Sequence, residues 1–366
     1  MQIVLDNIIY SKVKNGGVSN YWYELSKYLL EQKPASLTFL QQQKDLENFH
    51  RNLLPLSPED IFEIKTSIPQ LSRLLPINYK KEGKFIYHSS YYRGLWNQQN
   101  ALEITTVYDF VHSYYASFYN KTLHNYLKYR AIKRSKGVIC ISKNTYSDLQ
   151  KFCPLKKNQK REVIYVGVSD DYFLIINDHL LQMQFLNKHA IERDFLLFVG
   201  GRTNYKNFAF VSAILNNDNK LHLVVVGGGP LSGAETALFS VTALKRVIYI
   251  QSVKNNELNI LYNNAFALIY PSSYEGFGIP IVEAMRAGCP VIGLNNAVIR
   301  EVAEKSAMLL DRLDLQDFTT QKMKLNNSEF RTRIIEIGLE ESKKYSWKKC
   351  CEETYEFYTD VFNSDL

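Results

Sequence analysis

Two successions of short apolar runs, separated by amphipathic stretches such as Tyr21–Leu30 and Asn125–Lys136, constrain the fold of this chain more than any other feature. The runs of the first half are Gln2–Leu5, Ser36–Leu40, Phe85–Tyr87, Ile104–Val107, Val138–Ile141 and Val163–Val166. Those of the second half are Phe195–Val199, Leu221–Val226, Val247–Ile250, Ala267–Tyr270, Val291–Leu294 and Met308–Leu310. Short buried strands that alternate with helices predict mainly parallel sheets with helices on both faces. We therefore expect an α/β protein in which the same plan occurs twice.

The length of the chain agrees with two domains. Its 366 residues exceed the usual size of a single core, and 46% hydrophobic residues suffice to fill two. Turn-forming residues follow Val166 and place the boundary near residue 170. The expected domains are 1–170 and 171–344, followed by a helical, aromatic-rich segment at 345–366.

Targeting signals and metal-type cysteine spacing are not evident in the sequence. No window of about twenty apolar residues occurs, and the chain begins directly with a strand-like run, so neither secretion nor a membrane span is expected. The five cysteines are odd in number and lack metal-ligand spacing. These features favour a reducing cytoplasm.

Charge is distributed unevenly along the chain. Residues 1–168 contain 24 Lys and Arg against 13 Asp and Glu, and residues 169–366 contain 20 against 24. A basic first half is compatible with an anionic membrane surface, with a phosphate-bearing acceptor, or with a merely solvated basic surface. Nucleic acid is not expected as a partner, because no nucleic-acid-binding motif accompanies the charge.

A pair of carboxylates eight positions apart, Glu275 and Glu283, surrounds a glycine-rich turn. An apolar strand precedes this turn, and Pro280 suits the first turn of a helix after it. Glu275 is therefore expected in the loop and Glu283 about one turn into the helix, while Gly276 and Gly278 allow the backbone to present amides to an anion. An acidic residue in a first helical turn can also simply complement the helix dipole.

This arrangement resembles the Glu-x7-Glu motif of retaining nucleotide-sugar glycosyltransferases of family 4. The motif sequences of the chain are similar to those of bacterial surface-polysaccharide enzymes. The resemblance implies the GT-B fold, in which two Rossmann-like domains face each other across a cleft. The first domain would lie on the acceptor side, the second would bind the nucleotide sugar, and the C-terminal helix would cross back to the first. In that family the residue at Glu275 contacts the transferred sugar and that at Glu283 holds the ribose, with Gly276, Phe277 and Gly278 in the donor loop between them.

The first domain contributes two groups of candidates under this resemblance. Gly16 and Gly17 follow the first strand and would face the donor diphosphate, although the dinucleotide pattern Gly-x-Gly-x-x-Gly is absent. His112 follows a strand at the edge where open α/β sheets bind ligands, and would hydrogen-bond the transferred sugar. Asp109 would orient groups at the acceptor site. The family usually places the histidine beside the aspartate, so which of the pair fills the role stays open; His88 is a further candidate.

In the second domain, Arg202 and Lys206 follow a strand and two glycines, as in the family motif Gly-Arg…Lys-Asn. Fixed cations of this kind stabilise the charge that develops on a leaving diphosphate, so both residues are expected to bind it. Three glycines, Gly227–Gly229, end another strand and leave room for a base or ribose. Val253 lies in a segment that resembles the one pairing with the base edge.

The sequence lacks an Asp-x-Asp motif and any cluster of residues with metal-ligand spacing. No metal or other cofactor is therefore expected, and side-chain cations and helix ends would take the role that Mg²⁺ has in other transferases. A serine hydrolase is likewise unsupported, because Gly-x-Ser-x-Gly is missing.

These observations predict a cytoplasmic, retaining glycosyltransferase that moves a sugar from a nucleoside diphosphate to a hydroxyl of a growing glycan. A GDP-mannose donor is favoured over a UDP-sugar, and the basic first half suggests a polyprenyl-diphosphate-linked acceptor with peripheral contact to an anionic membrane. Two alternatives stay open, a nucleotide-sugar 2-epimerase of the same architecture and a non-catalytic GT-B protein that binds glycan. Linkage and oligomeric state are not predicted.

Overall fold

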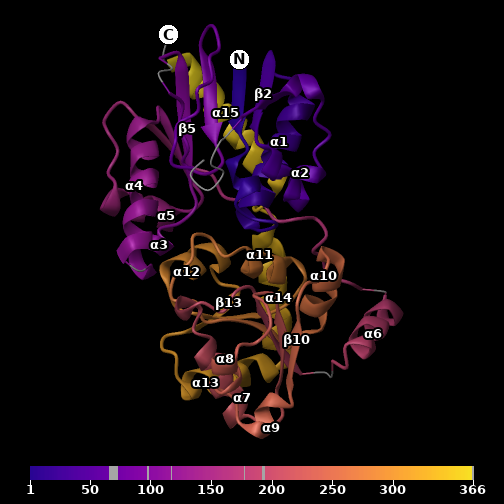
Figure 1. The fold of residues 1–366 in the computed structure, drawn as a ribbon. Helices are drawn as coiled ribbons and strands as arrows, with labels where there is room; N and C mark the ends of the chain where they lie inside the picture. The colour runs from indigo at the N-terminus through magenta and orange to yellow at the C-terminus, as the bar shows by residue number, and fades with distance from the viewer. Residues whose placement is uncertain (66–72, 97–98, 117, 177, 192–193, 365–366) are drawn as a thin grey trace. The chain divides into compact units, whose positions relative to one another are not determined.

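The structure, a computed structural model, describes residues 1–65, 73–96, 99–116, 118–176, 178–191 and 194–364 (Figure 1). It consists of two compact units, the first formed by Met1–Gly167 with Ser346–Leu366 and the second by Val168–Tyr345. The boundary expected from the sequence is at residue 170, and the units divide between Gly167 and Val168. Each unit contains one parallel sheet with helices packed against it, which confirms the predicted α/β class.

The sheet of the first unit has the strand order β3-β2-β1-β4-β5-β6-β7, and every neighbouring pair is parallel. Its strands are β1 (Gln2–Asp6), β2 (Ser36–Gln41), β3 (Ile61–Glu63), β4 (Phe85–Ser89), β5 (Ala101–Val107), β6 (Gly137–Cys140) and β7 (Lys160–Val163). Its α-helices are α1 (Gly17–Gln32), α2 (Phe49–Asn52), α3 (Val111–Tyr115), α4 (Phe118–Arg134), α5 (Lys143–Phe152) and α15 (Trp347–Ser364). Short 3-10 helices lie at Ile8–Ser11, Gln43–Glu47 and Pro58–Asp60.

Two edge strands of this sheet differ from the sequence prediction. The predicted strand Val163–Val166 is wrong in position, since β7 pairs with β6 through Lys160–Val163. The apolar residues that follow, Ile164 and Val166, are buried without lying in a strand. At an edge, ladder pairing rather than hydrophobicity sets the strand bounds, and β6 ends at Cys140 before Ser142 caps α5. The short strand β3 was not predicted.

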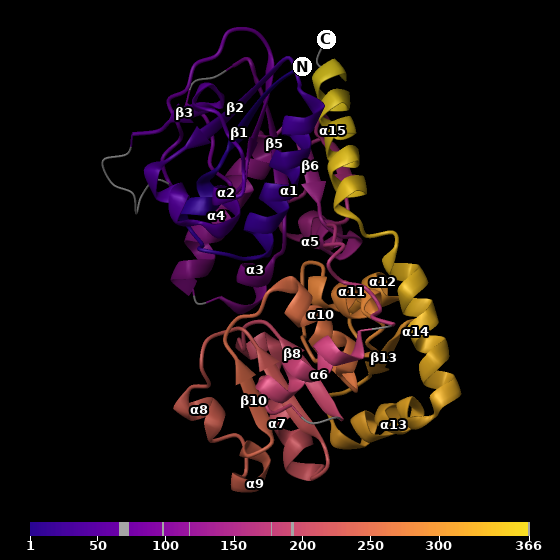
Figure 2. The same cartoon turned by 90° about the vertical axis from the view of Figure 1, so that its right-hand side faces the viewer.

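The C-terminal helix α15 packs on the sheet and on α1 of the first unit (Figure 2). The helix begins at Trp347, two residues later than predicted, and is described to Ser364, so positions 365 and 366 lie outside the described residues. Tyr358 of this helix bonds through its hydroxyl to Nδ1 of the buried His88. A Cβ at Gly137 would lie only 2.7 Å from the ring of Phe357, so glycine permits this close packing.

The sheet of the second unit has the order β10-β9-β8-β11-β12-β13, again parallel throughout. Its strands are β8 (Phe195–Val199), β9 (His222–Val226), β10 (Val247–Ile250), β11 (Ala267–Tyr270), β12 (Val291–Leu294) and β13 (Ala307–Leu310). Its α-helices are α6 (His179–Lys188), α7 (Phe208–Asn217), α8 (Gly233–Thr236), α9 (Val241–Leu244), α10 (Asn255–Asn264), α11 (Ile279–Arg286), α12 (Ala297–Ala303), α13 (Leu315–Asn326) and α14 (Ser328–Ser342). A 3-10 turn spans Asn204–Lys206.

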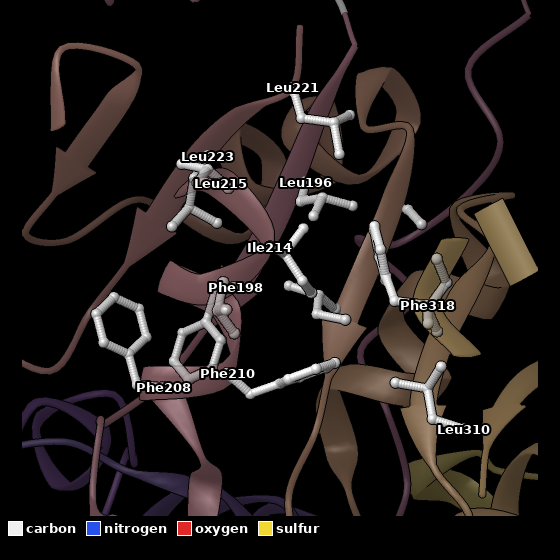
Figure 3. Packing of buried hydrophobic residues seen from close by; sticks show 14 of the residues in the cluster. Leu196, Phe198, Phe208, Phe210, Ile214, Leu215, Leu221, Leu223, Leu310 and Phe318 are labelled. Carbon is white, nitrogen blue, oxygen red and sulfur yellow. The ribbon is translucent and has the colours of Figure 1, made fainter. Parts of the chain in front are cut away.

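One face of the second sheet carries a hydrophobic cluster, part of which is drawn in Figure 3. Strand residues such as Leu196 and Leu223 meet Phe208 and Phe210 of α7 and Phe318 of α13 in this cluster. Its members are buried, and apolar burial is the main favourable contribution to folding. This packing holds β8, β9 and β11 in place, and with them the starting points of the loops that follow these strands.

Candidate donor and acceptor sites

In each sheet the strand order reverses at one place, and ligands of open α/β sheets bind beside such a reversal at the carboxyl ends of the strands. In the second unit β8 lies between β9 and β11, so the loops that follow β8 and β11 leave the same edge side by side. In the first unit the corresponding neighbours are β1 and β4. All the site residues predicted from sequence lie at or after the carboxyl ends of strands.

Lys206 and Glu275 are brought together by the loops after β8 and β11. The Lys206 Nζ lies 3.1 Å from Glu275 Oε1, and the two side chains are 16% and 14% exposed. Asn207 fixes the loops to each other, because its side-chain amide donates to the carbonyl of Pro271 and to Ser273 Oγ, both at 2.7 Å. The result is a largely buried cation beside a largely buried carboxylate, where charge interactions are stronger than in bulk water.

Glu283 lies in α11, which begins directly after the predicted loop. Gly278 precedes the helix with a φ of +91°, a conformation that suits glycine, and Pro280 is in the first turn. The Glu283 carboxylate accepts a 2.9 Å hydrogen bond from the hydroxyl of Tyr262, and the nearby hydroxyl of Tyr172 donates to Asn255 Oδ1 at 3.3 Å. Burial raises the pKa of Glu283 to about 7, although both hydroxyls oppose the shift. Sequence reasoning did not identify either tyrosine.

Arg202 binds protein groups in this structure. Its Nε donates to Glu235 at 2.7 Å, Nη1 donates to the Gly227 carbonyl at 2.9 Å, and Nη2 donates to the Gly229 carbonyl at 2.7 Å. The guanidinium therefore fastens the glycine-rich loop after β9. Gly228 in this loop has a φ of +76°, and a Cβ there would lie 2.9 Å from the Gly200 carbonyl oxygen. The structure places Lys206 beside Glu275 and Arg202 against the carbonyls of the glycine loop.

Three other predicted positions lie close to these loops in the chain. Val253 is half-buried in the loop between β10 and α10, at the same edge of the sheet as the glycine loop. Phe277 is buried and packs edge-on against Tyr345, with ring centroids 5.3 Å apart. Gly276 lies between Glu275 and Phe277 and is buried.

In the first unit, Gly16 and Gly17 form the start of α1. Gly16 has no side chain with which to cap the helix, so the first amides of α1 lack a side-chain cap. The preceding loop is fastened by Asn48, whose side-chain amide donates 2.7 Å to the carbonyl of Val13. An uncapped helix start on a held loop is a geometry that can receive an anion.

Asp109 and His112 lie in the loop after β5 and in the short helix α3. The Asp109 carboxylate accepts a hydrogen bond from the backbone amide of Val111 at 2.9 Å. The backbone carbonyl of Asp109 accepts one from Lys128 Nζ at 2.6 Å. The His112 ring stacks on that of His124, with centroids 3.8 Å apart and planes 16° from parallel. Burial lowers the pKa of His112, and burial with nearby cations lowers that of His124 to about 2.

His124 and Lys128 were missed by sequence reasoning. They are four residues apart in α4 and thus lie on one face of it, which is the only signal the sequence offers for them. Burial lowers the pKa of Lys128 to about 8, although Asp109 and Asp148 oppose the shift. His88, the alternative histidine, is fully buried and bonds Tyr358 and Thr106 through its two ring nitrogens, so it serves the core.

The residues that the structure describes contain no group of three or more His, Cys, Asp or Glu side chains placed to hold a metal ion. Within the same ranges no helix combines the length and the apolar character that a bilayer crossing needs.

Comparison with known families assigns the chain to a class. Residues 15–172 match the model described as Glycosyltransferase Family 4, and residues 183–340 match the model described as Glycosyl transferases group 1. In the structural comparison, sucrose-phosphate synthase from Thermosynechococcus elongatus has a TM-score of 0.74 at 18% identity, with all of both chains covered. The Anabaena protein HepE in complex with UDP-glucose has a TM-score of 0.72 at 13% identity, covering 98% of this chain and 100% of that one.

Curated relatives point in the same direction. The O-antigen chain mannosyltransferase RfbU of Salmonella typhimurium is 30% identical over 210 residues, which are 56% of this chain and 56% of that protein. The O-antigen chain mannosyltransferase B of Escherichia coli is 33% identical over 111 residues, 30% of this chain and 29% of that protein. The chain thus spans about half the length of the first relative and less of the second. Two parallel α/β units and consecutive matches to both family models define a GT-B glycosyltransferase. The chain belongs to the glycosyltransferases of family 4.

Proposed function

We propose that the protein transfers a hexose from a nucleoside diphosphate sugar to a hydroxyl of a growing surface glycan, with retention of anomeric configuration and without a metal ion. The observation that carries this proposal is the 3.1 Å pairing of Lys206 with Glu275 at the strand-order reversal of the second sheet. Glu283 lies on the helix that begins from the same loop. A cation beside a carboxylate, with a second carboxylate on the helix that follows, suits a diphosphate, a sugar and a ribose respectively.

Each side chain then has one task. Lys206 would bind the diphosphate, Glu275 would accept hydrogen bonds from hydroxyls of the sugar, and Glu283 would hold the ribose. In the transfer, the acceptor oxygen bonds to the anomeric carbon as the bond from that carbon to the diphosphate oxygen breaks. The acceptor proton passes to the departing diphosphate. Fixed donors around that diphosphate stabilise the charge it gains.

Arg202 is proposed to act at the same diphosphate through the glycine loop as well as by charge. Its bonds to the carbonyls of Gly227 and Gly229 fix the loop beside Gly200, which keeps the backbone close to the donor. Direct binding of the diphosphate by Arg202 would require it to exchange some of these bonds. Binding of a nucleoside diphosphate to Arg202→Lys tests this, because lysine keeps the charge and loses the fork of donors.

GDP-mannose is the donor we favour, since the O-antigen relatives are mannosyltransferases. The first experiment is calorimetry and thermal unfolding with UDP, GDP, dTDP and their sugar conjugates, without metal and then with Mg²⁺ or Mn²⁺. A ligand at a hundred times its dissociation constant stabilises a fold by about 2.7 kcal/mol. A shift with GDP-mannose in the absence of metal supports the proposal, whereas a shift only with a UDP-sugar or only with metal overturns that part of it.

The acceptor is proposed to be linked to a polyprenyl diphosphate at the inner face of an anionic membrane. The excess of basic residues in the first unit supports this, as does a basic hollow on α4 and the loop after α5. The hollow is lined by Tyr126, Tyr129, Arg130, Lys133, Arg134 and Lys156. Flotation with vesicles that contain or lack anionic lipid tests the membrane contact: lipid-independent behaviour favours a soluble glycan acceptor.

The two alternative functions have their own outcomes. Nucleotide binding without sugar transfer to any glycan would favour the epimerase, and binding of glycan alone would favour a non-catalytic protein.

A further inference from the structure

Lys128 is a buried lysine to which the proposed chemistry gives no task. It lies on α4, one turn after His124, and is 0% exposed. Its Nζ donates to the backbone carbonyl of Asp109 at 2.6 Å, and lies 4.4 Å from the centre of the Phe110 ring and 5.8 Å from that of Tyr92. Burying a charge is costly even where nearby groups compensate it in part. What this ammonium holds in place therefore needs an explanation.

Both polar groups of Asp109 are fixed by hydrogen bonds. The backbone carbonyl accepts from Lys128, and the carboxylate accepts from the amide of Val111 at 2.9 Å. The bond to Val111 closes a local turn between a side chain and the backbone two residues later. The bond from Lys128 is charge-assisted, and such bonds are roughly twice as strong as neutral ones. Lys128 thereby anchors the start of segment 109–115 to α4.

Further contacts join α3, which lies in this segment, to the same face of α4. Figure 1 shows α3, α4 and α5 together in the first unit. The His112 ring stacks on that of His124 at 3.8 Å between centroids, and Ser113 Oγ donates to Asn125 Oδ1 at 3.1 Å. Lys128 follows His124 by four residues and Asn125 by three, so the three share one face of the helix. The ring of His112 is oriented by the face that carries the ammonium.

Helix α5 holds the other side of the segment. The hydroxyl of Tyr114 donates to Asp148 at 2.6 Å, and the ring of Phe110 stacks on that of Phe152 with centroids 5.4 Å apart. The ammonium of Lys128 faces that Phe110 ring from the side of α4. It therefore lies where the contacts of the two helices meet, behind the loop that carries Asp109.

We propose that Lys128 is a positioning residue whose ammonium sets the direction in which the Asp109 and His112 side chains point. The inference rests on the proposed function and on the family resemblance, which implies roles for these two side chains at the transferred sugar and the acceptor. Because Lys128 is buried, it acts through the loop and not on a substrate. A misplacement of about 1 Å in a reacting constellation can lower a rate by about a hundredfold, so a loop held in this way affects turnover.

The ring of His112 reports on the loop directly, through NMR of the full chain with histidine labelled in the ring. Its proton signals are displaced by the ring current of His124, on which it stacks. Lys128→Met nearly keeps the length of the side chain and removes its charge, and we expect this displacement to fall by at least half. Lys128→Arg retains the charge and should retain most of the displacement. Loss of the signal in His112→Gln assigns it.

The matched control is Lys27→Met, which removes an exposed lysine of α1. It makes the same chemical change in the same unit, away from α3. The displacement of the His112 signal should be the same in this variant as in the wild type.

The proton on Lys128 supplies a second test. Burial lowers the pKa of Lys128 to about 8, although Asp109, Asp148 and Cys153 oppose the shift. Burial raises the pKa of Tyr92 and that of Cys153, so both of these neighbours keep their protons near pH 8. The change at this place around pH 8 is therefore the loss of the ammonium, and with it of the charge that strengthens the bond to Asp109.

His112 should report this loss as well. The pKa values of His112 and His124 are lowered by burial and by the cations Lys128 and Arg73, so neither ring titrates between about pH 7 and 9. The His112 signal of the wild type should move with a midpoint near pH 8. In Lys128→Met it should stay constant over the same range.

Stability should change in the opposite direction, which separates positioning from unfolding. The folded chain releases the Lys128 proton near pH 8, and the unfolded chain keeps it up to the ordinary 10.5. The unfolded chain thus binds more protons in this window, and Lys128 adds stability as the pH rises. The melting temperature of the wild type minus that of Lys128→Met should rise from about pH 8 to 9.5, while the ratio of their kcat values falls.

Turnover measures the consequence for the reaction. The donor is GDP-mannose, or the nucleotide sugar that calorimetry finds to bind in its place. Lys128→Met should lower kcat roughly tenfold and leave the donor dissociation constant within about twofold, because the loop serves the reacting groups and not the nucleotide. Lys128→Arg should recover most of the loss, and Lys27→Met should change neither value. Melting temperatures verify that the variants fold; if Lys128→Arg does not, the pH series of the wild type still decides.

Three results would overturn the inference: a His112 signal unchanged in folded Lys128→Met, a wild-type His112 signal that is constant from about pH 7 to 9, or a Lys128→Met variant with unaltered kcat. Failure of the proposed function looks different, since no nucleotide sugar would then bind the wild type in calorimetry. The NMR series uses no ligand, so it decides whether Lys128 holds the loop in either case.

Discussion

Lys206 and Glu275 lie 3.1 Å apart although one follows β8 and the other follows β11. The contact exists because these strands are neighbours where the strand order reverses. The two opposite charges offset each other in the structure. Under the proposed function, a diphosphate bound at Lys206 would leave the Glu275 carboxylate available to the sugar.

Glu275 and Glu283 should differ in what they control. Glu275→Ala is expected to lower kcat roughly a hundredfold or more, since contacts to the reacting sugar count mainly in the transition state. Nucleoside diphosphate binding should remain within a few-fold. Glu283→Ala should instead weaken nucleotide binding by about 1–3 kcal/mol, through the loss of hydrogen bonds to a charged acceptor. Calorimetry with the free nucleotide and steady-state kinetics with the sugar conjugate measure both; equal binding losses would contradict the division.

The affinity for donor should depend on pH through Glu283. Burial raises the pKa of this carboxyl to about 7, so below that pH it is mostly protonated and a poorer acceptor for ribose hydroxyls. Binding should weaken as pH falls from 8 to 6. A nucleotide sugar is the suitable ligand, because its diphosphate diester does not titrate in this range. The Glu283→Gln variant is the control: its affinity should be lower and flat, and a wild-type profile without slope would refute the assignment.

The same shift predicts an effect on stability with the opposite dependence on pH. Because the folded state keeps the proton up to about pH 7 and the unfolded state releases it near the ordinary 4.5, the residue destabilises the fold as pH rises through this window. The difference in melting temperature, wild type minus Glu283→Gln, should therefore fall as the pH rises from about 4.5 to 7. A difference between the two proteins that is constant with pH would argue against the buried carboxyl.

The stacking of His124 on His112 should matter for activity. Removing the ring with His124→Ala leaves His112 without the surface that orients it, so kcat should fall roughly tenfold. His124→Phe keeps an aromatic face and should retain most of the activity. Kinetics of the two variants beside His112→Ala separate stacking from chemistry; a phenylalanine variant as poor as the alanine one would show that His124 acts through its nitrogens.

Gly228 should tolerate no side chain. Its φ of +76° is unfavourable for other residues, and a Cβ would press against the Gly200 carbonyl oxygen at 2.9 Å. Gly228→Ala is expected to lower the free energy of unfolding by about 1–3 kcal/mol and to weaken nucleotide binding. Gly233→Ala is the control, since a Cβ there would meet nothing within 4 Å. Thermal unfolding of both variants, with and without nucleotide, gives the comparison.

The parts of the fold that the sequence predicted are those that depend on local pattern. Buried runs such as Phe195–Val199 and Ala267–Tyr270 are strands because their apolar residues are covered on both faces, and Gly278 with Pro280 marks a helix start by backbone chemistry alone. At the edge of the first sheet this reasoning failed, since β7 is polar and exposed and its bounds depend on its partner.

The contacts of the candidate site depend on tertiary structure and could not be predicted in the same way. No local signal shows that Tyr262 bonds Glu283 while Tyr172 packs edge-on against Tyr262, because this approach results from the docking of residues 171–175 on α10. The partners of Arg202 are mostly backbone carbonyls of the glycine loop, which have no side-chain signature. The contact of His124 with His112 could likewise not be predicted, since the stacking of the two rings depends on how α4 packs.

The bonding of Arg286 carries a practical consequence for making chimeric enzymes. Arg286, at the end of α11, donates to the carbonyls of Val168, Ser169 and Tyr345 and pairs with Asp170. These partners belong to the unit Val168–Tyr345, so an exchange of that block between relatives transplants the arginine together with the oxygens that it binds among the described residues. A cut a few residues later, at Ile175, would take Arg286 from one parent and Val168–Asp170 from the other. Donor specificity should therefore be transferable by swapping at residues 167/168 and 345/346, and chimeras joined inside the segment should assemble poorly.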